Sequence, residues 1–403
     1  MQKKRSIKII SIVLILVLIC ISITYVKSGN KVVLATTKEF NTENLQNNEH
    51  MHIEVDSSGN KVPVPNGYVG SKVAGENEID TGYVIYEGEE EVNDSNVEEA
   101  QKTRNQYVWI PVPDASTMYG TDANGKKWGK LYNFATSSNN VNFDEVTGTY
   151  PLNWSEKSEI YSVTKTGYRE PDVVLKSGDT VVYDEDSIIK QLFQEENSAH
   201  RLLIQVEKEF NNMITSIEKY GGFYIGRYET GNLSRDNYVI KKFNYDIAGQ
   251  TWYKMYLNCK KIKDNNENIE TGMIWGCQYD RTLMWLIETG NKTKEQVSED
   301  STSWGNYINA TFEYINQEGI ITEKVKSTLI PTGSTDYTKA NNIYDLVGNV
   351  SDWTAEATFS GSRVSRGGAH NSDGIQYKAG NHYSITPTSK SNARGCRAML
   401  YIK

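Results

Sequence analysis

The sequence predicts an α+β domain built from short strands, two principal helices and many loops. Short alternating runs at 105–112 and 221–231 end at Pro or Gly, which is typical of strands that stop at a turn. The segments 249–262 and 273–288 instead repeat apolar residues at three- and four-residue steps, the period of a helix. The composition, with 26 Tyr and 31 Gly but 8 Pro, suits a loop-rich domain of this class.

The overall composition excludes two broad classes of protein. The net charge is -8, and no basic block follows the first eight residues, so nucleic acid is not expected as a partner. Outside the N-terminal segment the cysteines are Cys259, Cys277 and Cys396, an odd number without CxxC spacing. At most one disulfide can form within a monomer, so an apolar core and not a disulfide scaffold must hold the fold. The oligomeric state is not predicted.

The first 26 residues predict a membrane anchor. Basic residues within the first eight positions precede an apolar run from Ile9 to Val26, which is long enough to cross a bilayer. This charge pattern places the N-terminus inside and the bulk of the chain outside the cell. No small-x-small cleavage site follows the run, which favours an uncleaved, single-pass anchor in the cell membrane over a cleaved signal and secretion.

The remaining chain divides into a stalk and one large domain. Residues 27–60 are polar and without periodicity, which predicts a stalk or linker. The domain is expected to span 61–403, with an insertion at about 114–220 and a core at 221–403. The insertion ends in a predicted helix at 197–220, because apolar residues recur there at helical spacing. The apolar stripe of that helix consists of Leu203, Val206, Phe210, Met213, Ile214 and Ile217.

Three C-terminal motifs carry a family resemblance. They are N-I-Y-D-L-V-G-N-V-S-D-W-T at 342–354, R-V-S-R-G-G at 363–368 and G-C-R at 395–397. In combination they resemble the formylglycine-generating enzyme, or sulfatase-modifying factor, family, although each motif alone is weak. The strands expected at 105–112 and 221–231 are similar to the opening strands of that family. The resemblance implies a variant of the C-type lectin fold. It also implies that the protein comes from a bacterium.

The resemblance also implies a structural calcium ion in the first motif. In the family this loop binds calcium through a side chain at the position of Asp345, carbonyls at Gly348 and Val350, and a Glu where Asp352 stands. Calcium takes six to eight hard oxygens, and Asp keeps the charge of Glu with a shorter reach. The alternative is a metal-free loop in which the Asp side chains cap backbone amides. Trp353 is expected to be a core anchor.

A copper-dependent activity is not expected. Formylglycine-generating enzymes hold copper(I) with two cysteines that follow the double glycine, at the positions of Ser372 and Tyr377 here. Hydroxyl groups do not replace thiolates for copper(I), so the prediction leans against an enzyme. The rival hypothesis is a metal-dependent oxidoreductase of the formylglycine-generating and nonheme-iron superfamily, with a non-cysteine centre made of His370, Ser372, Tyr377 and His382.

The segment 369–394 predicts a recognition surface. It is polar and rich in Asn, Ser, Tyr and His, and loops on a rigid scaffold commonly carry binding. The resemblance extends to the variable proteins of diversity-generating retroelements, which diversify this same stretch. We therefore expect a membrane-tethered, extracytoplasmic module that binds a protein or glycan ligand, with a surface protein lacking a specific ligand as a further alternative. The expected ligand-binding residues are His370, Asn371, Ser372, Tyr377, Asn381, His382 and Tyr383.

Overall fold

The computed structural model describes part of the chain. The described residues are 44–121, 125, 127–131, 168–169, 198–234, 237–245, 247–358 and 362–403. The predicted anchor at 1–26 and much of the predicted insertion lie outside them. Among the described residues, no helix combines the length and the apolar character that a membrane span requires.

The described elements are of mixed type, with few helices and many strands, which confirms the mixed α and β character of the prediction. The helices are α2 (Val97–Thr103), α5 (Ser198–Tyr220), α6 (Trp252–Cys259), α7 (Gly276–Glu288) and α8 (Lys294–Ser298), with short 3-10 turns η2 (Ala115–Thr117), η4 (Thr302–Trp304) and η5 (Asp336–Thr338). The strands of the first half are β1 (Met51–Val55), β2 (Lys61–Pro65), β3 (Tyr68–Gly70), β4 (Val84–Glu87), β5 (Gln106–Pro111), β6 (Tyr119–Thr121), β7 (Lys127–Gly129), β8 (Tyr168–Arg169), β9 (Gly222–Gly226), β10 (Gly231–Ser234) and β11 (Asn237–Val239). Those of the second half are β12 (Ile269–Met273), β13 (Glu313–Ile315), β14 (Ile321–Glu323), β15 (Lys339–Ala340), β16 (Ile343–Tyr344), β17 (Ser351–Thr358), β18 (Arg363–Arg366), β19 (Tyr383–Ile385), β20 (Arg394–Cys396) and β21 (Ala398–Ile402).

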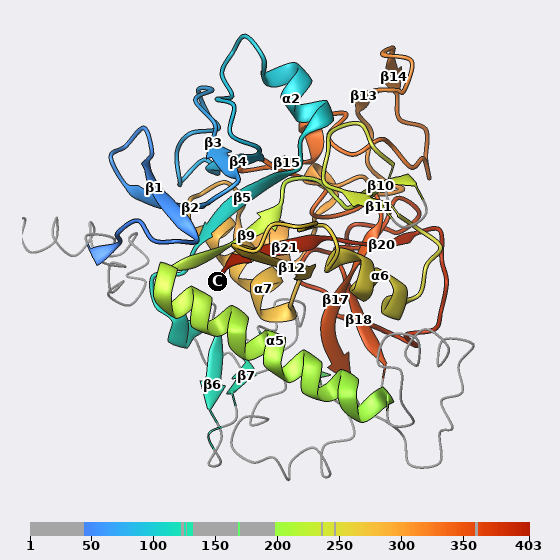
Figure 1. Cartoon of the computed structure of the whole chain (residues 1–403). Coiled ribbons are helices and arrows are strands. Elements are labelled where there is room, and N and C mark those ends of the chain that lie inside the picture. Colours follow the sequence, from blue (N-terminus) through green and yellow to red (C-terminus); the bar gives the residue numbers. More distant parts are fainter. Residues whose placement is uncertain are drawn as a thin grey trace, which may run out of the picture.

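A six-stranded antiparallel sheet forms the centre of the fold, with the order β12-β21-β9-β5-β4-β3 (Figure 1). The two strands expected from alternating sequence, β5 and β9, pair directly, from Tyr107 opposite Gly226 to Pro111 opposite Gly222. The last strand, β21, lies on the other side of β9. The sheet thus joins the beginning of the described chain to its end.

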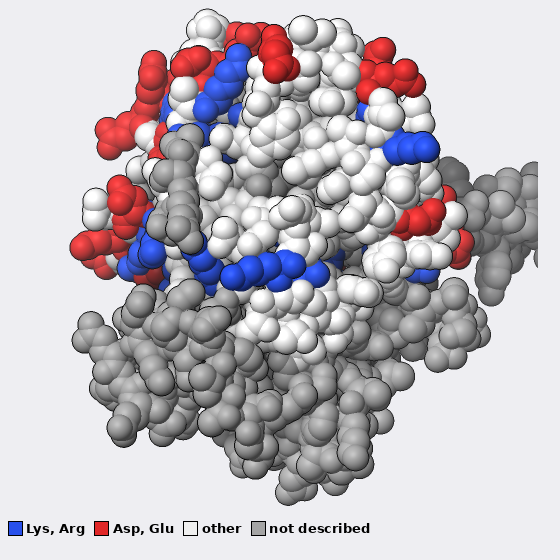
Figure 2. Space-filling view, turned by 90° about the vertical axis from the view of Figure 1, so that its right-hand side faces the viewer, with Lys and Arg blue, Asp and Glu red and all other residues white. Residues whose placement is uncertain are grey.

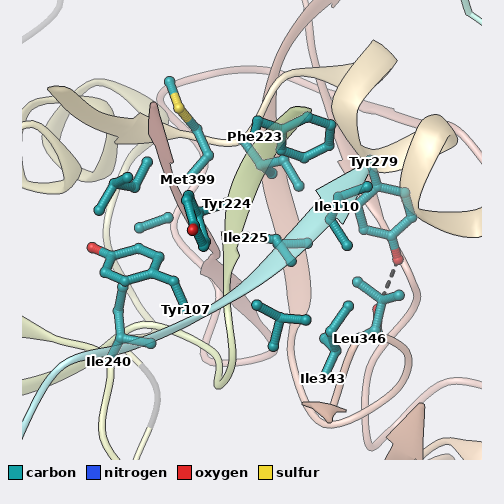
Figure 3. Close-up of a cluster of buried hydrophobic side chains, with 14 of the residues drawn as sticks. Tyr107, Ile110, Phe223, Tyr224, Ile225, Ile240, Tyr279, Ile343, Leu346 and Met399 are labelled. Carbon is teal, nitrogen blue, oxygen red and sulfur yellow. Dashed lines mark hydrogen bonds between the residues drawn. The ribbon is translucent and has the colours of Figure 1, made fainter. Parts of the chain in front are cut away.

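Buried side chains of this sheet form the core together with the C-terminal motif loop. Figure 3 shows Ile110 of β5 and Phe223 and Ile225 of β9 near α7 and the loop that carries Leu346. The hydroxyl of Tyr279 on α7 donates a hydrogen bond of 2.7 Å to the carbonyl of Leu346. The position of the loop is therefore fixed by the core and not by surface contacts alone.

The long helix α5 lies across the sheet and packs on β9 and β21 (Figure 1). The helix predicted at 197–220 is confirmed, and its described stripe, from Val206 to Ile217, is buried. The helix ends at Gly221, whose φ is +80° and whose N–H donates to the carbonyl of Ile217 at 2.8 Å. Glycine suits this position because it adopts left-handed backbone without strain. The stripe thus serves packing within the domain.

Helices α6 and α7 are confirmed but shorter than predicted. Thr251 caps α6, with its hydroxyl accepting from the N–H of Lys254. Trp275 precedes α7 in extended backbone, and its N–H donates to the side chain of Gln278 at 3.1 Å. Met273, the first residue of the predicted helix, instead ends β12, where it pairs with Ala398 of β21.

The stalk prediction was wrong for its last part, because residues before 61 are folded. Strand β1 pairs with β2, from Met51 opposite Pro65 to Val55 opposite Lys61. Met51 is buried. The carboxylate of Glu54 accepts from the N–H of Gly70 at 2.7 Å. The stalk was predicted because this segment lacks a periodic pattern of apolar residues. Its polar residues instead hold it to the domain through hydrogen bonds, which such a pattern does not reveal.

A second sheet has the order β19-β18-β17-β20, with β8 also paired to β17. Strand β17 is antiparallel to β18, with Asp352 opposite Arg366. It is parallel to β20, with Asp352 opposite Gly395. The three C-terminal motifs, far apart in sequence, therefore lie side by side in this sheet (Figure 1).

Candidate ligand-binding site

The first motif adopts a tight loop because several of its residues have left-handed backbone. The φ angles of Asn342, Asp345 and Asn349 are +64°, +55° and +51°, a region that Asn and Asp enter more readily than other side chains. The side chain of Asn342 donates to the carbonyl of Gly82 at 2.9 Å. The motif thus ties the C-terminal half of the domain to its N-terminal segment.

The double glycine after β18 permits a close approach of two chain segments. Gly367 and Gly368 have φ angles of +83° and +71°. A Cβ atom on Gly368 would lie 2.6 Å from the carbonyl oxygen of Tyr377, and one on Gly367 would lie 2.7 Å from that of Leu346. The segment that follows can therefore fold back over the sheet.

A cavity of about 170 Å³ opens where this segment folds back. Each strand of the order β19-β18-β17-β20 contributes to its lining, through Tyr383, Ser365, Ser351 and Arg394 respectively. Among the predicted ligand-binding residues, the cavity is lined by Asn371, Ser372, Tyr377, Asn381 and Tyr383. These residues, predicted from the sequence, are brought together by the fold.

Tyr377 and Tyr383 form an aromatic pair at this cavity. Their ring centroids are 5.4 Å apart, in an edge-to-face arrangement. The backbone below is fixed by Tyr307, whose hydroxyl lies 2.6 Å from the carbonyl oxygen of Gly367 and 2.9 Å from that of Tyr377. Burial and the neighbouring Tyr383 raise the pKa of Tyr377, so its phenol stays protonated at neutral pH and can donate a hydrogen bond.

Arg394 supplies the positive charge of the cavity, and sequence reasoning missed it. Its guanidinium lies over the ring of Trp353 at 5.0 Å and donates to the carbonyl of Ser389 at 3.4 Å. Burial lowers the pKa of Arg394, but guanidinium remains charged at any physiological pH. Its position next to the Gly-Cys-Arg motif was the signal available in the sequence.

The two remaining predicted residues, His370 and His382, do not line this cavity. His370 lies against Ser327, with Nδ1 3.1 Å from the serine hydroxyl, and burial lowers its pKa. The Nδ1 atom of His382 lies 2.5 Å from a carboxylate oxygen of Glu356. The two histidines therefore occupy different environments. The described residues contain no group of three or more His, Cys, Asp or Glu that could hold a metal ion.

His382 belongs to a buried charge cluster that links α7, β17 and β18. Arg366 forms ion pairs with Asp280 and with Glu356, the latter at 3.1 Å. Burial alone would raise the pKa of Glu356, but the neighbouring His382 and Arg366 hold it below its usual value. Arg366 lies between Ser365 and Gly367, which line the cavity, so the cluster supports the cavity from within the fold. Asp280 and Glu356 were not identified from the sequence, because their partner Arg366 lies in another segment.

Arg397 lies at the loop in which calcium is expected. Its Nη2 donates to the carbonyls of Tyr344 and Asp345, at 2.9 and 2.8 Å, and its Nε donates to Asp352 Oδ2 at 3.1 Å. Asp345 Oδ2 accepts from the N–H of Gly333 at 2.9 Å, as the metal-free alternative expects of an Asp in such a loop. Arg397 therefore supplies part of the positive charge that these groups require.

The donor set of this loop nevertheless fits a calcium ion. Asp345 Oδ1 and Asp352 Oδ1 are buried and have no hydrogen-bond partner among the described residues. Burial raises the pKa of both carboxyls, that of Asp352 to about 6. Two hard anionic oxygens without partners are the chemistry that calcium prefers. Calcium at Asp345, Gly348, Val350 and Asp352 stays a prediction.

Residues 287–402 match the family model of the sulfatase-modifying factor enzyme 1-like domain. This match confirms that the C-terminal part of the chain resembles the sulfatase-modifying factor family. The match includes the three motifs that meet in the second sheet and every residue that lines the cavity. No curated protein matches the chain.

Solved structures that match part of this chain have low sequence identity to it. CarF is 11% identical, with coverage of 45% of this chain and 87% of CarF and a TM-score of 0.29. Variable protein 1 of Treponema denticola is 13% identical, with coverage of 45% and 85% and a TM-score of 0.29. PvdO from Pseudomonas aeruginosa is 14% identical, with coverage of 45% and 82% and a TM-score of 0.27.

Proposed function

We propose that this sulfatase-modifying-factor-like protein is an extracytoplasmic, membrane-tethered binding module whose C-terminal loops, 369–394, recognise a protein or glycan ligand. The observation that carries the proposal is the cavity itself. It contains Ser372 and Tyr377, at the positions where the resembled enzymes hold copper with cysteines. The cavity is concave, and the two positions that carry thiols in those enzymes carry neutral hydroxyl groups here.

The lining of the cavity suits recognition. Hydroxyl, amide and aromatic groups converge on a rigid base formed by the second sheet, and such convergence is typical of ligand sites. The aromatic pair Tyr377 and Tyr383 supplies contact area with little loss of side-chain entropy. The proposal includes the C-type lectin variant of the fold that the motifs imply, in which loops on a fixed scaffold vary without loss of the core.

The location outside the membrane rests on the sequence of residues 1–26. Basic residues precede an apolar run of membrane-spanning length there, which favours an anchor with the domain outside. The part of the predicted stalk up to residue 43 lies outside the described residues. A protease-protection assay on intact cells checks this orientation, because an internal domain would resist added protease.

The rival oxidoreductase hypothesis receives less support. It requires His370 and His382 to share a centre with Ser372 and Tyr377, but His382 contacts Glu356 and His370 contacts Ser327. Stoichiometric copper or iron in the purified protein would favour the rival and overturn the non-catalytic proposal.

The decisive experiment measures binding of the purified full-length chain, in detergent micelles, to an array of defined glycans, peptidoglycan fragments and surface proteins. The test variant combines Asn371→Ala with Tyr383→Ala, two exposed positions of the cavity. The control is Ile321→Ser, which changes an exposed apolar residue on β14. We expect the test variant to lose at least about tenfold in affinity for the bound probe, with the control unchanged.

Equal binding by the test variant and the native chain would overturn the role of loops 369–394. Circular dichroism melting of all three proteins accompanies the assay, because a lower melting temperature of the test variant would assign its loss of binding to unfolding. The single variants Asn371→Ala and Tyr383→Ala then separate the two contributions.

A further inference from the structure

We propose that the cavity binds a carboxylate-bearing sugar ring, such as a hexuronate residue of an acidic glycan, and that Arg394 binds the carboxylate. This inference rests on the proposed function and names the ligand class of the same site. It follows from the charge, the size and the free hydrogen-bonding groups of the cavity.

Arg394 is a positioned cation without an anionic partner in the described part of the chain. Among the described residues, the guanidinium donates to the carbonyl of Ser389 at 3.4 Å and lies over the ring of Trp353, and no described Asp or Glu forms an ion pair with it. The ring of Trp353 holds the guanidinium in place from one side. A half-buried guanidinium that lacks a carboxylate has unused donors, and guanidinium donors match the geometry of a carboxylate.

Among the described residues, none that lines the cavity is acidic and would repel an anion. Two carboxylates lie close in sequence but have other partners. Asp352 is paired with Arg397, and Asp373 accepts from the N–H of Ile375 at 2.8 Å. Figure 2 shows a face on which many atoms are uncharged, with Lys and Arg side chains across its middle and most Asp and Glu toward its margins. The charge of Arg394 is therefore available to a ligand.

The size of the cavity corresponds to one ring. A volume of about 170 Å³ is close to that of a cavity of about 150 Å³ that binds benzene. Drug-sized ligands occupy about 300 Å³ or more, so the cavity takes a single residue of a larger molecule and leaves the remainder in solvent. Tyr383, which is 47% exposed at the cavity, can stack on the apolar face of such a ring.

The neutral polar groups suit a hydroxylated ligand. The side chains of Asn371 and Ser372 make no hydrogen bond within the described residues. Ser365 likewise has a hydroxyl without a described partner. Groups that can both donate and accept match sugar hydroxyls, which also do both. A simple inorganic anion would use Arg394 but would leave these groups unused.

The test titrates the full-length chain in micelles with D-glucuronate, D-glucose and sodium sulfate, and measures binding by isothermal calorimetry and ligand-observed NMR. Glucose has the ring without the charge, and sulfate has the charge without the ring. We expect glucuronate to bind at least about tenfold more tightly than either, since a hydrogen bond to a charged group accounts for a factor of this size.

Variants at two neighbouring basic residues test the assignment. Arg394→Gln should abolish the preference for glucuronate over glucose, and Arg394→Lys should keep a weaker preference because it keeps the charge without the planar geometry. Lys390→Gln, at an exposed residue outside the cavity lining, should behave as the native chain. If Arg394→Gln fails to fold, the weaker preference expected of Arg394→Lys still tests the role of the planar guanidinium, and an unchanged preference would contradict it.

Each contrary outcome overturns a defined part of the inference. If glucose binds as tightly as glucuronate, the carboxylate has no role in binding. If sulfate binds as tightly as glucuronate, the site does not recognise a sugar ring. If neither sugar binds while the array assay gives a probe whose binding depends on Asn371 and Tyr383, this inference fails and the proposed function stands. If the array binding is also independent of these residues, both fail.

Discussion

Arg397 and Asp352 form a fully buried ion pair, with Arg397 Nε 3.1 Å from Asp352 Oδ2. The same guanidinium donates to the carbonyl of Gly226 in β9, at 3.0 Å. One side chain therefore joins the two sheets, and the closing Gly-Cys-Arg motif and the first motif meet through it.

Substitution Arg397→Met should destabilise the domain strongly. It leaves Asp352 buried without its partner, and breaking a buried pair in this way costs about 3–5 kcal/mol. Urea unfolding followed by tryptophan fluorescence measures the change. The double variant Arg397→Met, Asp352→Leu should recover part of the loss, because it removes the unpaired charge as well. A loss below about 1 kcal/mol in the single variant would contradict the structural role of this pair.

Calcium removal should lower the melting temperature. Asp345 Oδ1 and Asp352 Oδ1 have no partner among the described residues, so a bound calcium would stabilise the folded state by mass action. Mass spectrometry should find about one calcium ion per chain, and EGTA should lower the melting temperature by a few degrees. The variant Asp352→Asn should lose this response. A chelator-insensitive native protein would show that Arg397 alone neutralises the loop.

Gly348 should tolerate no side chain. Its φ is +75°, and a Cβ atom there would lie 2.3 Å from the backbone nitrogen of Asn306. Gly290 provides a matched control, because its φ is +72° but nothing lies within 4 Å of its Cβ position. Chemical unfolding should show a cost of about 1 kcal/mol for Gly290→Ala from backbone strain. Gly348→Ala should cost about 2 kcal/mol more, and equal costs would refute the steric argument.

Cys259 and Cys396 should form a disulfide under oxidising conditions. Their sulfur atoms are 3.4 Å apart although 137 residues separate them, and both thiols are free and buried. Oxidised glutathione would take up the two electrons, and the two thiols would release two protons. Burial raises the pKa of the Cys396 thiol, so the reaction should be slow at neutral pH and faster at higher pH.

Peptide mass mapping after alkylation measures this bond. Cys277 should remain a free thiol and serves as the internal control. A Cys277–Cys396 bridge, or no bridge after prolonged oxidation, would contradict the prediction.

Acid should weaken the N-terminal hairpin through Glu54. Burial by itself would raise the pKa of Glu54, but hydrogen bonds from His52, Lys72 and the N–H of Gly70 lower it to about 2. Because the folded pKa lies below the unfolded value of 4.5, the stabilisation is fully present above about pH 4.5 and is lost as the pH falls toward 2. Glu54→Gln should therefore flatten the acid limb of a stability profile.

The control for Glu54 is Glu318→Gln, which changes an exposed carboxylate in the turn between β13 and β14. Thermal melting between pH 2 and pH 6 compares the variants. An unchanged acid limb in Glu54→Gln would indicate that these hydrogen bonds do not form in solution.

Much of the candidate site could be predicted from local sequence. The polar stretch after the double glycine contains Asn371, Ser372, Tyr377, Asn381 and Tyr383, and the fold gathers them around one cavity. Motif spacing located them because these residues follow a fixed turn at Gly367 and Gly368. His370 and His382 were assigned by the same reasoning and lie elsewhere, because side-chain direction within a loop depends on the contacts that each residue finds.

Arg394 and the buried cluster of Arg366, Asp280 and Glu356 could not be located from local sequence. The partners in that cluster come from α7, β17 and β18, and nothing in one segment specifies a charge in another. The proximity of Cys259 and Cys396 could not be predicted either, because it depends on how α6 and β20 pack together.

The sequence by itself determined the elements whose residues carry a local period and the loop whose turns need Asn, Asp and Gly at left-handed positions. It also determined that cysteines are missing at positions 372 and 377. Tertiary structure alone decided that β1 belongs to the folded domain, that Arg394 faces a cavity, and that Arg397 joins two sheets. The physical reason is that periodicity and turn propensity act over a few residues, whereas burial and charge pairing depend on segments brought together from the whole chain.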